Sequence, residues 1–183
     1  DDIYGRLVYN GNTFTPISSL SDAIRKQTIV INGVSKTYAM TGWRVGFAVG
    51  EPEIISGMAK IISQTTSNLT SVSQYAAIEA LTGDQSSIEE MRKAFEERLN
   101  TIYPLLAEVP GFEVIKPQGA FYLFPNVKKA MEIKGYTDVN DFTNAILEEA
   151  EVALVTGAGF GAPENIRLSY ATDLDILKEA VRR

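Results

Sequence analysis

Two residue types that carry much of enzyme chemistry, cysteine and histidine, are absent from this sequence. Without cysteine the chain cannot form a disulfide, a cysteine nucleophile or a cysteine zinc site. Without histidine it cannot build a Ser-His-Asp arrangement either. Any chemistry must therefore use lysine, tyrosine, aspartate, glutamate, arginine or serine, and no metal site is expected.

A basic excess and a long apolar run are missing as well. The sequence has 23 acidic and 17 basic residues and a formal net charge of −6, so nucleic acid is a poor candidate partner. No apolar run approaches the roughly 20 residues that cross a bilayer, and no signal-peptide pattern opens the chain. These absences predict a cytoplasmic protein with no membrane partner.

The sequence does contain enough apolar material for a folded core, because 45% of its 183 residues are hydrophobic. It opens without methionine in DDIYGRLVY, which is typical of the end of a strand. We therefore expect a piece of a longer polypeptide.

The first half of the chain alternates strand and helix signals. Runs of β-branched residues predict strands at 28–34 and 44–50 with a loop between them. Pro52 suits the first position of a helix, and capping-box spacing at Ser71 predicts the start of another that ends near Gly83.

A longer helix is expected next, with one apolar face made by Ile88, Met91, Phe95, Leu99 and Ile102. Pro104 should kink or shorten its end. The predicted elements after Gly111 are strands at FEVI (112–115), GAFYLF (119–124), VALVTG (152–157) and NIRLSYA (165–171), and helices at about 138–150 and 173–182. This order predicts an α/β protein in which residues 1–85 are part of a large domain and residues 86–183 form a smaller α+β domain.

Lys36 is the candidate for chemistry, because of the residues around it. Ser35 and Arg44 supply a hydroxyl and a guanidinium, which are the groups that bind phosphate, and Gly42 and Gly46 permit close backbone approach. An isolated lysine would be assigned to the solvated surface. Here a phosphate-bearing cofactor tethered to the amine is the better interpretation.

The run SKTYAMTGWRVG resembles the pyridoxal-phosphate attachment motif of class I aminotransferases of the aspartate and aromatic type. The motif reads Ser-Lys, three residues, Met, one residue, Gly, one residue, Arg, one residue, Gly. It is matched at Ser35, Lys36, Met40, Gly42, Arg44 and Gly46.

The opening DDIYGRLVY is similar to another segment of that family. The resemblance implies that Asp1 pairs with the protonated pyridine nitrogen and that Tyr4 donates to the phenolic oxygen of the cofactor ring. A carboxylate beside the pyridinium keeps it charged and so able to accept electron density.

A third segment, ENIRLSYAT, resembles the part of the family that binds the substrate α-carboxylate, here through Arg167. A planar guanidinium suits a carboxylate bidentately. GAFYLF and VALVTGAGFG also look like the family's small domain, so the resemblance covers the whole chain. Phe121 and Tyr122 are expected to be core residues.

The resemblance implies the C-terminal half of an aspartate-aminotransferase-like enzyme. In that reading Lys36 forms a Schiff base with pyridoxal 5'-phosphate and then acts as a base at the substrate Cα. The substrates would be an amino acid and a 2-oxo acid, and the parent protein would be a homodimer. The isolated piece is expected to be inactive.

Two alternatives remain open at this point. Other pyridoxal-phosphate enzymes of the same fold, such as carbon–sulfur lyases or synthases, share the lysine, the aspartate and the phosphate-binding arginine. The chain could also be the ligand-binding domain of a transcription regulator that retains the aminotransferase fold.

Overall fold

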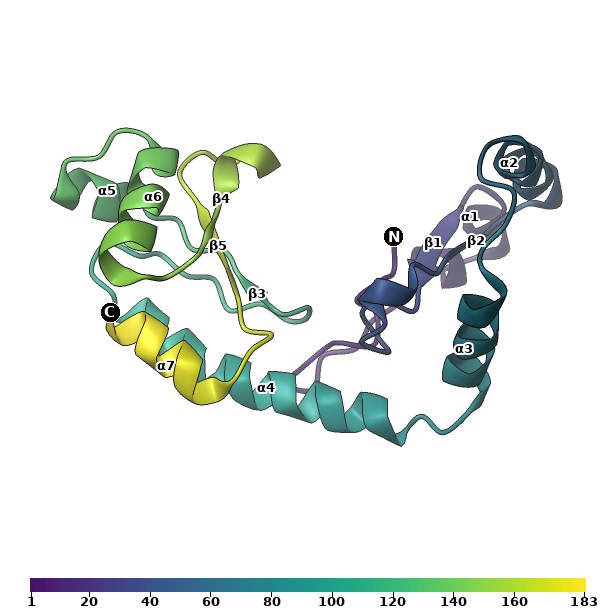
Figure 1. Cartoon of the computed structure of the whole chain (residues 1–183), viewed down its shortest axis with the longest axis horizontal. Helices are drawn as coiled ribbons and strands as arrows, with labels where there is room; N and C mark the ends of the chain where they lie inside the picture. Colours follow the sequence, from purple (N-terminus) through teal and green to yellow (C-terminus); the bar gives the residue numbers. More distant parts are fainter. The chain divides into compact units, whose positions relative to one another are not determined.

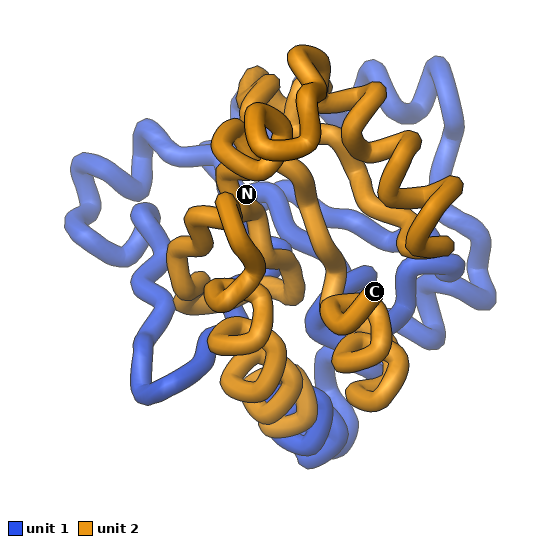
Figure 2. The backbone as a smooth tube through the Cα atoms, turned by 90° about the vertical axis from the view of Figure 1, so that its left-hand side faces the viewer, with its two compact units in different colours: residues 1–92 blue, residues 93–183 orange.

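A computed structural model describes residues 1–183, which fold into two compact units, Asp1–Arg92 and Lys93–Arg183 (Figure 2). Each unit combines helices with a small antiparallel sheet, as expected for an α/β protein. The units divide inside helix α4, Ser86–Ala107, and the domain boundary between residues 85 and 86 remains a prediction. No helix combines the length and the apolar character needed to span a membrane.

The sheet of the first unit is a pair of strands, β1 (Val30–Gly33) and β2 (Gly46–Val49). They run antiparallel, with Gly33 opposite Gly46, which confirms the two strands predicted on either side of a loop. Both strands are shorter than the runs 28–34 and 44–50 from which they were predicted. Residues 34–45 connect them and contain Lys36.

The helical elements of this unit are the short turns η1 (Ile17–Ser19) and η2 (Thr41–Trp43), the helices α1 (Asp22–Lys26), α2 (Pro52–Thr65) and α3 (Ser71–Thr82), and the start of α4 (Figure 1). Pro52 occupies the first turn of α2, as predicted. The capping box at Ser71 is wrong, because Thr70 is the residue that precedes the helix with extended backbone. Its hydroxyl bonds to the buried Ser73 hydroxyl at 2.9 Å instead of capping a backbone N–H.

Helix α4 confirms the predicted apolar face, because Ile88, Phe95, Leu99 and Ile102 are buried and Met91 is half-buried. The predicted shortening at Pro104 is wrong, since the helix runs on to Ala107. Proline removes one backbone hydrogen bond, to the carbonyl four residues earlier, and both residues of that pair are exposed to water.

The second unit has a three-stranded antiparallel sheet in the order β3-β5-β4 and three helices after α4. Its elements are β3 (Tyr122–Leu123), α5 (Lys128–Lys134), α6 (Val139–Ala150), β4 (Val155–Thr156), the turn η3 (Gly157–Phe160), β5 (Ile166–Ser169) and α7 (Leu174–Arg182). The helices expected near 138–150 and 173–182 are confirmed, each capped by an aspartate side chain, Asp138 and Asp173.

Two features of this unit differ from the prediction. The FEVI segment is not a strand: Glu113 forms a single bridge with Asn126, and Ile115 is 89% exposed, so no apolar face holds it to the sheet. Helix α5 was missed, although Gly135, with its left-handed φ of 78°, closes it as a typical C-terminal glycine.

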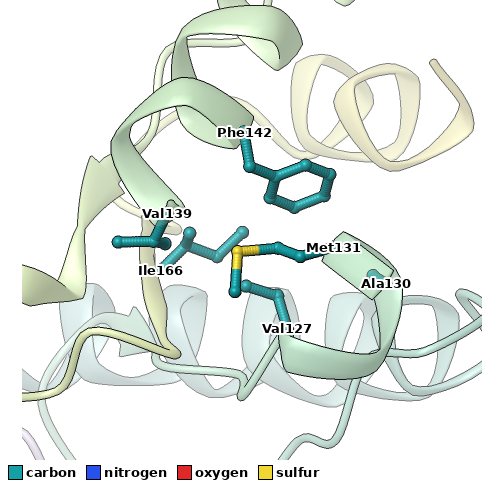
Figure 3. Packing of buried hydrophobic residues seen from close by; sticks show 6 residues of the cluster. All are labelled: Val127, Ala130, Met131, Val139, Phe142 and Ile166. Atoms are coloured by element: carbon teal, nitrogen blue, oxygen red, sulfur yellow. The ribbon is translucent and has the colours of Figure 1, made fainter. Parts of the chain in front are cut away.

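The second unit has a contiguous core between α5, α6 and β5 (Figure 3). Its buried members are Val127, Ala130, Met131, Val139, Phe142 and Ile166. The first unit buries less around its sheet, where the cluster consists of Val34, Val45 and Ala77. Helix α2 has no buried residue, and on α3 Val72 and Tyr75 are 71% and 75% exposed. The first unit therefore leaves large apolar side chains uncovered.

Candidate active site

Lys36 lies in the turn that follows β1, and the backbone of this turn is well anchored. The fully buried Val34 donates its N–H to the Val45 carbonyl at 3.2 Å. Tyr38 N–H donates back to the Val34 carbonyl at 3.2 Å. Lys36 itself is half-buried, so a fixed backbone presents a side chain that remains partly accessible.

Tyr4 is brought close to Lys36 by the N-terminal segment. Asp2 N–H donates to the Ile31 carbonyl at 2.8 Å, which holds this segment beside β1. The Lys36 Nζ lies 6.0 Å from the centroid of the Tyr4 ring. The fold thus gathers two candidate residues that are far apart in the sequence.

Asp1 is exposed, whereas its expected role called for a carboxylate shielded beside the cofactor ring. Its Oδ1 accepts a hydrogen bond from Ile3 N–H at 3.0 Å, because the side chain folds back over the next turn. The residue therefore lies on the same N-terminal segment as Tyr4, with its carboxylate on the surface.

Ser35 and Arg44 belong to the same connection between β1 and β2. Ser35 is half-buried and Arg44 is exposed, and Arg44 Nη1 donates to the Thr41 carbonyl at 2.9 Å. Arg44 and Ala39 have φ values of 55° and 53°, the left-handed region that non-glycine residues seldom adopt. Such conformations cost about 1–3 kcal/mol each and concentrate where ligands bind.

The glycines of this region differ in what surrounds them. A Cβ at Gly33 would lie 2.6 Å from the Val45 carbonyl oxygen, so the close approach of the strands before Lys36 requires glycine there. No atom lies within 4 Å of a Cβ built at Gly42, and the nearest to one at Gly46 is 3.5 Å away. The protein itself leaves space at the two glycines of the motif.

Arg167 is on β5 in the second unit and is half-buried. Its Cζ lies 4.6 Å from the centroid of the Tyr122 ring and 4.7 Å from that of Phe160. No acidic side chain forms an ion pair with it, and its guanidinium makes no hydrogen bond to the protein. Arg167 is therefore a positive charge held by aromatic rings, with its N–H groups available.

Sequence reasoning missed the two rings around Arg167. Phe121 stacks on the buried Phe95 at 5.3 Å, as a core residue should, but Tyr122 contacts Arg167 and Phe160 was not singled out. The available signal was alternation along β3, because the fully buried Leu123 next to Tyr122 places the tyrosine on the opposite face of the strand.

The whole chain, residues 1–183, matches the family model described as aminotransferase class I and II. The chain belongs to this family. A class I and II aminotransferase has the α/β fold of pyridoxal-phosphate transferases, and the helices and sheets described above agree with it.

Curated relatives with high identity are also aminotransferases by name. An asparagine–oxo-acid transaminase from Streptococcus mutans serotype c is 76% identical over 183 residues, which are 100% of this chain and 47% of that protein. An aspartate aminotransferase from Bacillus subtilis is 55% identical, with the same coverage. The chain thus spans about half the length of the curated relatives it matches.

Solved structures extend the similarity to the fold. The aspartate aminotransferase from Rhizobium meliloti superposes with a TM-score of 0.90 at 38% identity, over 100% of this chain and 47% of that one. The aromatic aminotransferase from Pyrococcus horikoshii OT3 has a TM-score of 0.91 at 35% identity, over 100% and 48% of the two chains.

The residues of this chain fit the cofactor that its family implies, pyridoxal phosphate. Lys36 offers an accessible amine for the aldehyde, and the phenol of Tyr4 lies beside it. The hydroxyl of Ser35 and the guanidinium of Arg44 suit a phosphate, and the space at Gly42 allows a ligand to approach the backbone. The donor set is the right chemistry for a phosphorylated aldehyde.

Proposed function

We propose that the full-length protein containing this chain transfers an amino group between an amino acid and a 2-oxo acid, with pyridoxal phosphate held on Lys36. The observation that carries the proposal is the position of Lys36, in an anchored turn with its amine 6.0 Å from the Tyr4 ring. The family of the chain and the names of its relatives support the same activity.

In the first unit, different residues would bind different parts of the cofactor. Lys36 Nζ would hold the cofactor covalently, Tyr4 would donate to the phenolic oxygen of its ring, and Asp1 would pair with the ring nitrogen. Ser35 and Arg44 bind the phosphate through charge-assisted hydrogen bonds. Bound pyridoxal phosphate supplies an electron sink for the bond that breaks at the substrate Cα.

Lys36 and Arg167 act on the substrate. With the cofactor and substrate bound, the Lys36 Nζ would be the base that takes the proton from the substrate Cα. Arg167 binds the α-carboxylate of the amino acid and of the 2-oxo acid, which orients both for the same proton transfer. A carrier that alternates between two acids predicts ping-pong kinetics.

The isolated chain is proposed to be inactive. The first unit exposes large apolar side chains on α2 and α3 and has a sheet of two strands, which is marginal by itself. The rest of the polypeptide, and the second copy in a homodimer, would complete the cofactor site. A cytoplasmic location belongs to the same proposal.

Asparagine and aspartate are the proposed amino donors, because relatives at 76% and 55% identity are named for them. The test is to load the full-length protein with pyridoxal phosphate, reduce it with borohydride and map the modified peptide. Asparagine, aspartate and an aromatic amino acid are then compared as donors with one 2-oxo acid acceptor.

A reduced adduct on Lys36 and formation of a new amino acid from the acceptor are the expected results. Release of ammonia from a donor without any acceptor would instead assign a lyase. An adduct with no turnover of any donor would favour the ligand-binding domain of a regulator. No adduct on Lys36 would refute the cofactor assignment.

A further inference from the structure

The sheet of the second unit has two chemically different faces. Leu123, Ile166 and Leu168 point to one face and are buried. Tyr122 pairs with Ser169, so Arg167, two residues before Ser169 on β5, is its diagonal neighbour on the other face. The register of β3 against β5 therefore places the Tyr122 ring beside the Arg167 guanidinium.

Phe160 reaches the same guanidinium from the turn η3, whose geometry is tightly constrained. Gly157 N–H donates to the Asn165 carbonyl at 2.7 Å, and a Cβ at Gly157 would collide with the carbonyl oxygens of Ala162 and Asn165. Thr156 caps the turn by accepting from Ala158 N–H at 3.2 Å. The backbone that carries Phe160 is thus fixed by these contacts.

Both rings are braced by further aromatic residues. The Phe160 ring meets Phe124 edge to face at 6.2 Å, and the Tyr122 ring lies 4.8 Å from Phe121. Phe121 in turn stacks on Phe95 in the core. These contacts limit the motion of the rings, more so for the half-buried Tyr122 than for Phe160, which is 55% exposed.

We propose that Tyr122 and Phe160 are positioning residues that hold the Arg167 guanidinium between their rings and keep its N–H edges free for the substrate carboxylate. This inference rests on the proposed role of Arg167. Cation–π contacts hold the flat faces of a guanidinium, whereas a protein carboxylate would occupy the N–H groups that the substrate needs. The two rings therefore orient the Arg167 guanidinium without occupying its hydrogen-bond donors.

The test uses the full-length protein loaded with pyridoxal phosphate and maleate as an unreactive dicarboxylate probe. Tyr122→Leu and Phe160→Leu each remove one ring, whereas Tyr122→Phe and Phe160→Tyr keep it. Calorimetry gives the maleate Kd, and the Kd for pyridoxal phosphate reports whether the cofactor site is intact. KM and kcat for the amino donor are measured in parallel.

Tyr103→Leu is the matched control, because it removes a different cation–π pair of the same unit. There Lys116 Nζ lies 5.6 Å from the Tyr103 ring centroid, and Arg167 is not involved. This variant reports the general effect of losing a half-buried tyrosine ring.

Loss of either ring should raise the maleate Kd and the KM by roughly 3- to 30-fold, the range of a cation–π contact. The affinity for pyridoxal phosphate should be unchanged. The ring-keeping variants should stay within about twofold of the wild type because they retain the aromatic face beside Arg167. Tyr103→Leu should do so because its ring contacts Lys116 and not Arg167. Tyr122→Leu should add nothing further to the effect of Arg167→Ala, because both act through one guanidinium.

The outcomes separate the two claims. If Arg167→Ala weakens maleate binding and both leucine variants bind as the wild type does, the positioning role is refuted and the role of Arg167 stands. Additive effects of Tyr122→Leu and Arg167→Ala would also refute positioning. If Arg167→Ala leaves the maleate Kd unchanged, the proposed carboxylate site is itself wrong. If one leucine variant does not fold, the maleate Kd of the leucine variant at the other ring tests the proposal, together with Phe160→Tyr, which keeps the ring.

Discussion

The hydroxyl of Tyr38 donates a hydrogen bond to Oε1 of Gln85 at 3.2 Å, although the two residues are 47 positions apart. Gln85 Nε2 donates to the carbonyls of Ala80 and Gly83, both at 2.9 Å. The amide of Gln85, the residue before α4, therefore connects Tyr38 in the Lys36 turn to the C-terminal end of α3. Every polar atom of that amide has a partner.

Tyr38→Phe should lower the free energy of unfolding of the full-length protein by about 1 kcal/mol, the usual value of one such hydrogen bond. Urea unfolding checks this, and Tyr103→Phe, at a half-buried tyrosine of the second unit whose hydroxyl makes no hydrogen bond, is the control that should change nothing. Gln85→Glu should cost more, because its carboxylate would face two carbonyl oxygens. Equal stability of Tyr38→Phe and wild type would mean that the bond contributes nothing.

Lys36→Ala should abolish the borohydride-stable adduct and reduce turnover by about 10²- to 10⁴-fold, the contribution of a positioned general base. Lys60→Ala, at an exposed lysine of α2, should leave both unchanged. Steady-state rates and peptide mapping give the two readouts. Retention of the adduct in Lys36→Ala would move the covalent site to another lysine.

Gly33→Ala should destabilise the protein by about 1–3 kcal/mol, because the new methyl group meets the backbone of Val45 and Gly46 at 2.6 Å and 3.2 Å. Gly42→Ala should stay within about 0.5 kcal/mol of wild type, since nothing lies within 4 Å. Thermal unfolding compares them. Gly42→Ala should nevertheless weaken pyridoxal phosphate binding if the cofactor uses the space there; unchanged affinity would contradict that use.

Glu179 connects stability to pH at the C-terminal helix. Hydrogen bonds from Arg182 and then Arg183 lower the pKa of its carboxyl from 4.5 to about 2. A lowered folded-state pKa stabilises the protein fully above pH 4.5, and this stabilisation is lost as the pH falls from 4.5 toward 2. The Tm difference between wild type and Glu179→Gln should therefore shrink over that interval.

The control for this pH effect is Glu148→Gln, at an exposed glutamate of α6 without an ion pair. Its Tm should follow that of the wild type throughout. High salt should reduce the Glu179 effect, because its side chain is 42% exposed and water and ions screen the pairs. A Tm difference that persists at pH 2 would show that Glu179 acts through packing.

Several elements were predictable because their signals are local. The β-branched runs on either side of Lys36 became β1 and β2, and the aspartate caps of α6 and α7 stand at the positions where the helices begin. Local sequence signals failed for segments whose secondary structure depends on burial. FEVI has strand composition but no face to bury, and α5 has only Ala130 and Met131 to anchor it.

The sequence by itself determined the family motif around Lys36, because Ser35, Lys36 and Arg44 lie within one short connection whose spacing can be read directly. Only the tertiary structure decided what surrounds Arg167. Tyr122 comes from β3, Phe160 from η3 and Arg167 from β5, and strand register together with a glycine-dependent turn brings them together. Contacts between separate elements depend on pairing and packing, which no local periodicity encodes.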